Sequence, residues 1–417
     1  MTALLSELVA IPSVQGKREE GAPFGKEPAR ALGTMLKRCK EYGFIVENTD
    51  NYAGSADINE LSPELAVLTH LDVVPVGTGW TGNPFTLKYV PENDKLIGRG
   101  TIDDKGPAVA ALFAARAIKE LGLPLKKGIR LIFGTNEENG SADLAYYREK
   151  HSLPKMVFTP DGEYPLINAE KGMLRVHFSS DFFDGEISEI QAGTVINAVP
   201  QFCTVIIDGA GVAKEKAVYD GVPAHASTPE LGENAITMFL DGYSGENLLL
   251  LNLAQLFPHG ETDGKSCGLG FSDEISGKMT CVFSLLNAEK GRIKGAVDIR
   301  FPLDRKKSEI SRIICDKLTE AGFEIDSCEG VEPHRTDENS EFVQTLLRVY
   351  ERVTGDVGRC IAIGGGTYVH DIDGGVAFGA EFPGRNNNMH SPDEYITTEE
   401  LLQNAEIMAE AMAELCC

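Results

Sequence analysis

The chain lacks the features by which membrane proteins and nucleic-acid-binding proteins are usually recognised. No stretch among its 417 residues approaches the roughly 20 consecutive apolar residues that cross a bilayer. Basic residues are scarce, with 39 Lys and Arg against 63 Asp and Glu, so the formal net charge is -24. Nucleic acids and anionic membrane surfaces would repel such a chain. We therefore expect neither as a partner, whereas a bound cation would suit the charge.

Signals for disulfide bonds and for export are also missing. The nine cysteines are odd in number and scattered, and no two form a Cys-x-x-Cys motif. The first residues carry no basic segment, and Glu7 interrupts their apolar run, which is not the pattern of a signal peptide. We interpret the cysteines as free thiols and expect the protein in the cytoplasm.

The length and composition suit a large core of two to three domains, because 42% of the residues are hydrophobic. Apolar residues at helical spacing predict helices over 26–43, 107–122, 247–257, 340–355 and 397–415. Short apolar runs bounded by polar residues or Gly predict strands over 64–68, 129–133 and 156–158. Alternating runs predict an antiparallel sheet that includes 174–178 and 204–207.

This change of pattern along the chain predicts an inserted domain. Residues 1–172 and 333–417 are expected to form one discontinuous domain, and residues 173–332 to form the insertion. The expected fold class is α/β, with a mixed, mainly parallel sheet in the discontinuous domain and an α+β insertion built on the antiparallel sheet.

Side chains that bind metals follow the predicted strands of the discontinuous domain. His70 and Asp72 come directly after one strand and share a side of the sheet by the two-residue alternation. The carboxyl ends of parallel strands converge on one crevice of an open α/β sheet. We therefore expect the following side chains to meet there: His70, Asp72, Asp103, Glu137, Glu138 and Asp161.

Each of these groups alone would more often be a solvated surface residue than a ligand. Together they concentrate negative charge, which bound cations would relieve. Histidine with carboxylates and no cysteine suits zinc or manganese, because calcium and magnesium prefer oxygen alone. His390 offers a second imidazole near the C-terminus. His225 lies among small residues and prolines, in a loop that could present its ring to another surface.

Several motifs resemble, in order and spacing, those of the PepV-like dipeptidases (Xaa-His dipeptidase type) of the di-metal aminoacylase and desuccinylase superfamily. The similarity covers essentially the whole chain. It rests on His70-Leu-Asp-Val-Val-Pro75, Gly98-Arg-Gly-Thr-Ile-Asp-Asp-Lys-Gly-Pro107, Glu137-Glu-Asn-Gly-Ser141, Thr159-Pro-Asp-Gly-Glu-Tyr-Pro165, Gly364-Gly-Gly-Thr-Tyr368 and Met389-His390.

The resemblance implies a di-metal exopeptidase-like catalytic domain that holds two divalent ions, zinc or manganese. The implied ligands are His70, Asp103, Glu138, Asp161 and His390, with Asp103 bridging both ions. A cis peptide bond between Asp103 and Asp104 is also implied. Asp72 would orient His70, and Glu137 would be the general base that acts on the water between the metals.

The insertion resembles the lid of this family. By the same resemblance, Asn197 and His225 would reach the scissile carbonyl, and Arg300 would hold the C-terminal carboxylate of the substrate. Backbone N–H groups of residues 364–367 would bind the same anion. An enlarged lid of this type takes the place of a partner subunit in the family, so we predict a monomer.

The sequence therefore predicts a metal-dependent dipeptidase that hydrolyses small peptides with a free C-terminal carboxylate, through a water that bridges two metal ions. One alternative is an amidohydrolase that deacylates N-acyl amino acids at the same di-metal site. The other is a peptide-binding member of the fold that has no catalytic activity.

Overall fold

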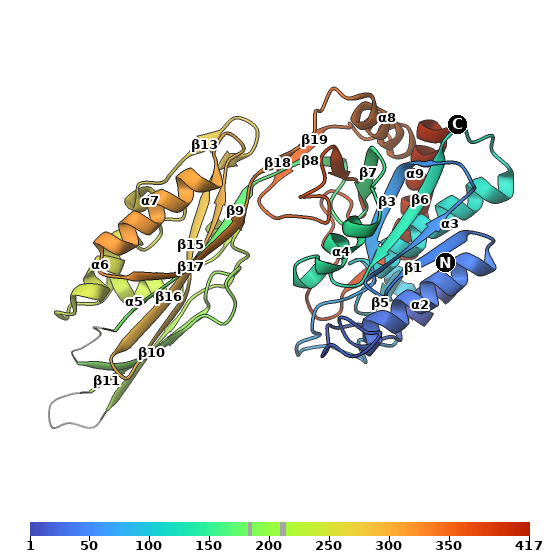
Figure 1. Cartoon of the computed structure of the whole chain (residues 1–417). Helices are drawn as coiled ribbons and strands as arrows, with labels where there is room; N and C mark the ends of the chain where they lie inside the picture. Colours follow the sequence, from blue (N-terminus) through green and yellow to red (C-terminus); the bar gives the residue numbers. More distant parts are fainter. Residues whose placement is uncertain (182–185, 209–213) are drawn as a thin grey trace. The chain divides into compact units, whose positions relative to one another are not determined.

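The computed structural model describes residues 1–181, 186–208 and 214–417, which form two compact units (Figure 1). The first unit comprises Met1–Asn168, Thr336–Ile361 and Thr367–Cys417, and the second comprises Ala169–Arg335 and Ala362–Gly366. All nine cysteines fall within the described residues and are free thiols, as predicted. Within the same residues, no helix has both the length and the apolar character needed to cross a membrane.

The first unit is built on a mixed sheet whose centre is parallel. Its central strands, in spatial order, are β6 (Gly128–Gly134), β3 (Pro63–His70), β7 (Met156–Thr159) and β20 (Gly375–Ala377). The antiparallel strands that flank them are β2 (Ala53–Asp57), β1 (Ile45–Thr49) and β8 (Leu166–Glu170). A separate three-stranded sheet contains β4 (Lys88–Val90), β5 (Lys95–Ile97) and β21 (Tyr395–Thr397).

The helices of this unit are α1 (Thr2–Val9), α2 (Lys26–Glu41), α3 (Lys105–Leu121), α4 (Ala142–Lys150), α8 (Glu341–Thr354) and α9 (Thr398–Cys416). Helix α3 packs against α9, and its small side chains Ala108, Ala111 and Ala115 are fully buried. It ends at Gly122, whose φ of 63° is the left-handed conformation that glycine adopts without strain. Helix α9 begins with a capping box formed by Thr397 and Glu400.

The second unit is a seven-stranded antiparallel sheet with helices on one face. Its spatial order is β12 (Glu215–Asp220), β11 (Phe202–Ile207), β10 (Ile187–Ala192), β15 (Thr280–Glu289), β16 (Arg292–Phe301), β9 (Gly172–Ser180) and β17 (Glu324–Val331). The helices are α5 (Ala235–Asp241), α6 (Leu248–Leu256) and α7 (Lys307–Glu320). The shorter strands β13 (Ser272–Asp273) and β14 (Gly277–Lys278) pair with each other, whereas β18 (His334–Arg335) and β19 (Cys360–Ile363) both pair with β8 of the mixed sheet.

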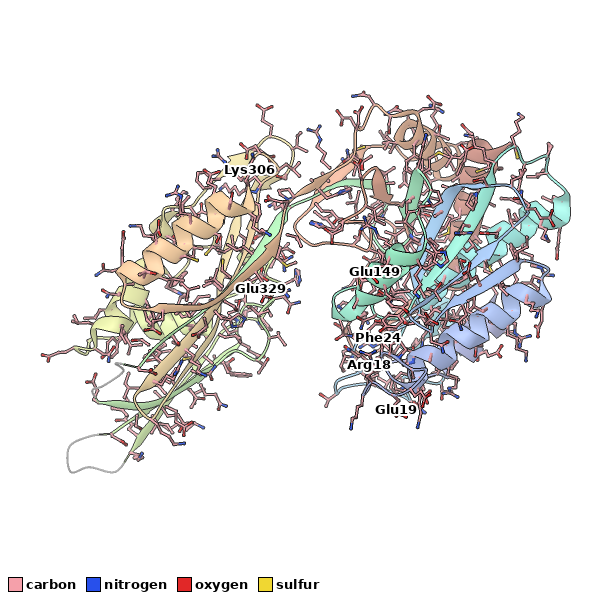
Figure 2. All side chains as sticks on the ribbon, viewed as in Figure 1. Arg18, Glu19, Phe24, Glu149, Lys306 and Glu329 are labelled. Carbon is pink, nitrogen blue, oxygen red and sulfur yellow. The ribbon has the colours of Figure 1, made fainter. Side chains whose placement is uncertain are left out.

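Alternation along β9 explains how the two faces of this sheet differ. Leu174, Val176 and Phe178 are buried in the core that also contains apolar residues of the three helices. The intervening residues Arg175 and His177 are half-buried and exposed, respectively, on the other face. Glu329 lies on the neighbouring strand β17 and is labelled in Figure 2.

The structure confirms the predicted fold class, with an α/β unit and an α+β unit that contains an antiparallel sheet. The predicted strands at 64–68, 129–133 and 156–158 correspond to β3, β6 and β7, each within two residues at either end. The helix expected from residue 107 begins two residues earlier, at Lys105, which places Asp104 at its N-cap.

Candidate active site

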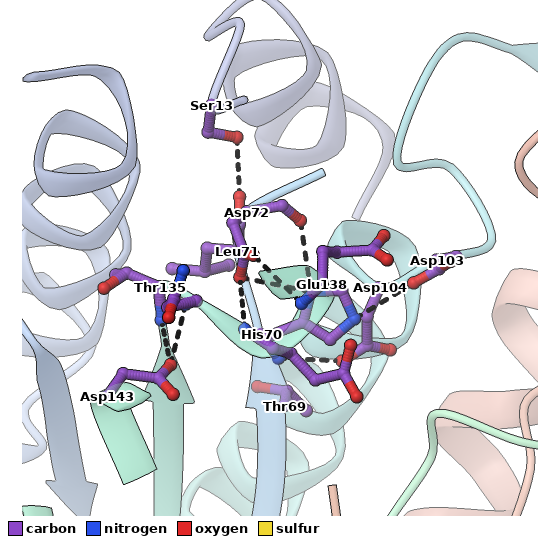
Figure 3. A network of polar contacts seen from close by, with 12 residues as sticks. Ser13, Thr69, His70, Leu71, Asp72, Asp103, Asp104, Thr135, Glu138 and Asp143 are labelled. Carbon is purple, nitrogen blue, oxygen red and sulfur yellow. Dashed lines mark hydrogen bonds and ion pairs between the residues drawn. The ribbon is translucent and has the colours of Figure 1, made fainter. Parts of the chain in front are cut away.

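His70 lies at the C-terminal end of β3, and its ring is fixed from one side by Asp72 (Figure 3). Its Nδ1 is 3.1 Å from the Asp72 carbonyl oxygen and 3.5 Å from the Asp72 Oδ1. The His70 backbone N–H donates to the Asp104 Oδ2 at 3.0 Å. A proton on Nδ1 therefore has acceptors, and the lone pair of Nε2 is left for another partner.

Asp103 belongs to two groups of side chains that could each hold a metal ion. In the first group its Oδ1 lies 3.0 Å from the His70 Nε2, and the Asp161 Oδ2 lies 3.8 Å from the same nitrogen. In the second group its Oδ2 lies 2.6 Å from the His390 Nε2, which is 3.4 Å from the Glu138 Oε2. The peptide bond between Asp103 and Asp104 is cis, as predicted.

The donor atoms fit a pair of divalent cations. The His70 Nε2 and the Glu138 Oε1 are buried, and neither has a hydrogen-bond partner among the residues that the structure describes. A neutral imidazole with its proton on Nδ1 would turn a lone pair toward the Asp103 and Asp161 carboxylates, which is unfavourable unless a cation lies between them. Imidazole nitrogen and carboxylate oxygen are the donors that zinc and manganese accept.

The electrostatics of the cluster show an excess of negative charge. Burial, and then the charge of Asp103, raise the pKa of Asp161 to about 7. Burial and Asp161 also raise the pKa of Glu137 well above its ordinary value. Burial alone would lower the pKa of His390, but its hydrogen bonds to Asp103 and Glu138 raise it to about 11. In the absence of cations, the negative charge of the cluster thus favours the protonated forms of these side chains.

The loop that carries Glu137 and Glu138 is held by two carboxylates that belong to neither metal group. The Asp72 Oδ1 and Oδ2 accept the backbone N–H groups of Glu137 and Glu138, both at 3.2 Å. The Asp143 Oδ2 accepts the N–H groups of Thr135 at 2.6 Å and Asn136 at 2.8 Å, and also a hydrogen bond from the Tyr368 hydroxyl. Asp72 therefore positions both His70 and the two glutamates.

The three remaining candidates lie in the second unit. Asn197 and His225 are neighbours there, because Ala198 bridges to His225 and the Asn197 carbonyl accepts the Ala226 N–H at 2.9 Å. The His225 Nδ1 lies 2.6 Å from the Ser227 Oγ. Arg300 is only 3% exposed and pairs with Asp298. The catalytic and binding roles of all three, and of the metal-site residues, remain predictions.

Comparison with known proteins identifies the family. The model of peptidase family M20/M25/M40 matches residues 66–414, which is most of the chain. The chain belongs to this family. It is therefore an enzyme that hydrolyses peptide bonds, which confirms the predicted enzyme class and, at the level of the family, the resemblance described above.

Relatives of the chain include a protein named Beta-Ala-Xaa dipeptidase from Lactobacillus delbrueckii subsp. lactis. The two are 33% identical over 453 residues, which cover 99% of this chain and 95% of the relative. The fold matches human carnosine dipeptidase 1 with a TM-score of 0.63 at 16% identity, covering 99% and 96% of the two chains. It also matches the Bacillus subtilis YXEP protein, described as a dinuclear metal binding peptidase, with a TM-score of 0.55 at 11% identity, covering 100% and 99%.

The sequence did not reveal a buried ion pair that supports the candidate active site. The Arg99 Nη1 lies 2.6 Å from the Glu394 Oε2, and both residues are at most 1% exposed. The Glu394 Oε1 accepts the N–H groups of Ile102 at 3.0 Å and Asp103 at 3.4 Å. The pair thus ties the Asp103 loop to the segment that follows His390. The sequence shows Arg99 between two glycines and an acid four residues after His390, but neither feature indicates that the two residues pair.

Proposed function

We propose that the chain is a metal-dependent dipeptidase that hydrolyses dipeptides with a free C-terminal carboxylate. The observation that carries this proposal is Asp103, which is shared by two groups of histidine and carboxylate donors within a peptidase of family M20/M25/M40. The similarity to the Beta-Ala-Xaa dipeptidase over nearly the whole chain supports a dipeptide as the substrate class.

Two divalent ions, zinc or manganese, are proposed to occupy the cluster. His70 and Asp161 would hold one ion, Glu138 and His390 the other, and Asp103 both. Such ions polarise a peptide carbonyl and promote ionisation of a water. Asp72 orients His70 through Nδ1 and holds the backbone of the glutamate loop through both carboxylate oxygens.

Glu137 is the proposed general base. It takes the proton of the attacking water and passes it to the leaving amine. It is the acid of the Glu137-Glu138 pair that belongs to neither metal group. Asp72 accepts the Glu137 N–H, and Asp143 accepts the N–H of the preceding residue, Asn136. These two hydrogen bonds fix the backbone from which the Glu137 side chain extends.

The proposed domains are a catalytic domain of residues 1–172 and 333–417 and a lid of residues 173–332. Asn197 and His225 are proposed to stabilise the negative oxygen that develops on the scissile carbonyl. Arg300 and the loop 364–367 are proposed to bind the substrate carboxylate. We also propose that the enzyme is a cytoplasmic monomer, and light scattering that showed a stable dimer at micromolar concentration would contradict this.

The test is hydrolysis of a panel of α-dipeptides and β-alanyl dipeptides, each compared with its N-acetylated form. The protein is stripped of metal and reloaded separately with zinc and manganese. We expect cleavage of the free dipeptides alone, and only after reloading. Cleavage of the acetylated forms alone would instead indicate a deacylase. Absence of cleavage in every sample would support the peptide-binding alternative.

A further inference from the structure

Tyr368 is a buried tyrosine that the proposed reaction does not yet use. It ends the Gly364-Gly-Gly-Thr-Tyr368 motif and lies in the first unit, where it is only 3% exposed. Its ring belongs to an apolar cluster that also contains Leu68 of β3 and Ile132 of β6. The ring is therefore anchored on the two strands that lead to His70 and to the glutamate loop.

The hydroxyl of Tyr368 donates a hydrogen bond to a carboxylate that is fully buried. The acceptor is the Oδ2 of Asp143, which lies in the first turn of α4. The same oxygen accepts the backbone N–H of Thr135 at 2.6 Å (Figure 3) and that of Asn136 at 2.8 Å. Three donors thus converge on one oxygen, and two of them belong to the turn that leads directly into Glu137.

Gly134, the last residue of β6, leaves the space that this contact needs. A Cβ atom at this position would overlap both the Tyr368 hydroxyl and the Asp143 carboxylate. Any other residue would therefore push the phenol and the carboxylate apart, and only glycine lets the backbone approach so closely. The contact is thus specified by the end of β6 as well as by the two side chains.

The ring of the same tyrosine also contacts His70. The centroids of the two rings are 6.1 Å apart and their planes meet at 84°, which is an edge-to-face arrangement. Asp72 contacts the same imidazole at Nδ1 and accepts the backbone N–H of Glu137. Tyr368 and Asp72 therefore support the same two parts of the site, the imidazole and the glutamate loop, through separate contacts.

We propose that Tyr368 is a positioning residue for the proposed general base, Glu137. Through Asp143, its hydroxyl fixes the turn at residues 135 and 136, and with it the backbone from which the Glu137 side chain extends. This inference rests on the role of Glu137 in the proposed function and extends it to a residue outside both candidate metal groups. A small misplacement of a catalytic group can lower the rate by about a hundredfold, so support of this kind should be visible in kcat.

The first experiment compares Tyr368→Phe with Tyr147→Phe in the metal-loaded enzyme. Phenylalanine keeps the ring and removes only the hydroxyl, so kcat for a dipeptide should fall by about tenfold to a hundredfold while KM stays within about twofold. Tyr147 is the matched control, because it is a fully buried tyrosine of the same apolar cluster whose hydroxyl accepts a hydrogen bond from Arg130 at 3.3 Å. Its kcat, KM and metal content should equal those of the wild type, and the metal content of Tyr368→Phe should do so too.

Hydrogen–deuterium exchange of the metal-free proteins measures the positioning without catalysis. Burial, and then the charge of Asp72, raise the pKa of Asp143 to about 6, whereas the hydrogen bond from Tyr368 lowers it. Without that hydroxyl the carboxyl is protonated more readily, and a protonated oxygen holds the backbone N–H groups less well. The amide protons of Thr135 and Asn136 should therefore exchange about tenfold faster in Tyr368→Phe and at the wild-type rate in Tyr147→Phe.

Asp143→Asn tests whether Tyr368 acts through Asp143, and it keeps the test decisive if Tyr368→Phe is poorly folded. Asparagine keeps the shape of the side chain but replaces one acceptor oxygen with a donor, so kcat should fall at least as far as in Tyr368→Phe. Adding Tyr368→Phe to Asp143→Asn should lower kcat by less than about twofold more, because the effects of residues in one hydrogen-bond network are not additive.

The outcomes separate this inference from the proposed function. An unchanged kcat in Tyr368→Phe or in Asp143→Asn would overturn the inference and leave the function intact, whatever the exchange rates. An equal loss of kcat in Tyr147→Phe would also overturn it, because a general loosening of the cluster would then explain the effect. Fully additive losses in the double variant would show that Tyr368 does not act through Asp143. Failure of the metal-loaded wild type to hydrolyse any dipeptide would overturn the proposed function, and this inference with it, even if the exchange showed that Tyr368 holds the turn.

Discussion

The two units each contain a cluster of charges with buried carboxylates, and the clusters differ in how their charges are balanced. In the first unit, the carboxylates of Asp103, Glu138 and Asp161 outnumber the two imidazoles beside them. In the second unit, Arg175 and Arg300 share the carboxylate of Asp298, and Glu329 lies opposite Arg175, so positive and negative charges are equal in number. Buried charges are normally paired, because leaving water is costly. The excess of carboxylates in the first unit therefore indicates that a cation completes that cluster, whereas the second is balanced by its own side chains.

The two clusters are organised in the same way. In each, one fully buried aspartate fixes the groups around it: Asp72 holds His70 and the glutamate loop, and Asp298 holds Arg175 and Arg300. Neither aspartate belongs to a candidate metal group. Their contribution is orientation, which metal sites and carboxylate sites both require.

The largest effect is expected on kcat, when Glu137 of the first unit is replaced and the metal donors are kept. Glu137→Ala removes the proposed base and none of the candidate metal donors, so kcat should fall by about 10²- to 10⁴-fold. Metal content, measured by atomic absorption, should stay near two ions per chain. Glu149→Ala, an exposed glutamate on α4 labelled in Figure 2, is the control and should retain full activity. Retained activity in Glu137→Ala would show that another group is the base.

A smaller effect is expected when the balance of the second cluster is changed. Asp298→Asn leaves the buried Arg300 guanidinium without its counter-charge, which should lower the free energy of unfolding by about 3–5 kcal/mol. Urea unfolding followed by circular dichroism measures this. Asp316→Asn, an exposed residue of α7, should change stability by less than about 1 kcal/mol. Equal stability of Asp298→Asn and the wild type would contradict the view that Asp298 organises the cluster.

The smallest expected effect is a gain in stability, and it concerns the first cluster in the metal-free protein. Asp161→Asn removes one of several like charges that repel one another, so the metal-free protein should gain about 0.5–2 kcal/mol of stability. Thermal unfolding in the presence of a chelator measures the gain, and exposed Asp373→Asn serves as the control. A loss of stability would mean that Asp161 makes a net favourable contact even in the absence of cations.

The sequence predicted the fold and the composition of the first cluster well, because both follow from local patterns. Apolar runs located β3, β6 and β7, and the rule that parallel strand ends converge brought His70, the glutamate loop and Asp161 together. Asp103 was expected in the same crevice and His390 was offered as a second imidazole, and the structure groups both with these residues. The roles of these residues stay predictions until they are tested.

The parts that escaped prediction depend on long-range register. Arg99 and Glu394 are nearly 300 positions apart, and nothing in either local sequence specifies that they pair. Arg175 meets Asp298 only because β9 and β16 adopt one register among several that their alternation allows. Alternation along a single strand gives the face on which a side chain lies, but not its neighbour on the next strand.

The way the chain passes between the units has a consequence for its synthesis. The second unit is nearly continuous, whereas the first needs Thr336–Ile361 and Thr367–Cys417 to be complete. The C-terminal helix α9 covers α3, and His390 precedes α9 by fewer than ten residues. The apolar side of α3 therefore stays uncovered during synthesis until α9 has been made, and His390, the last candidate metal-site residue, is made only after the continuous part of the second unit. A chain that ends before residue 390 lacks both His390 and α9, so it cannot complete the candidate metal site and leaves the apolar side of α3 uncovered.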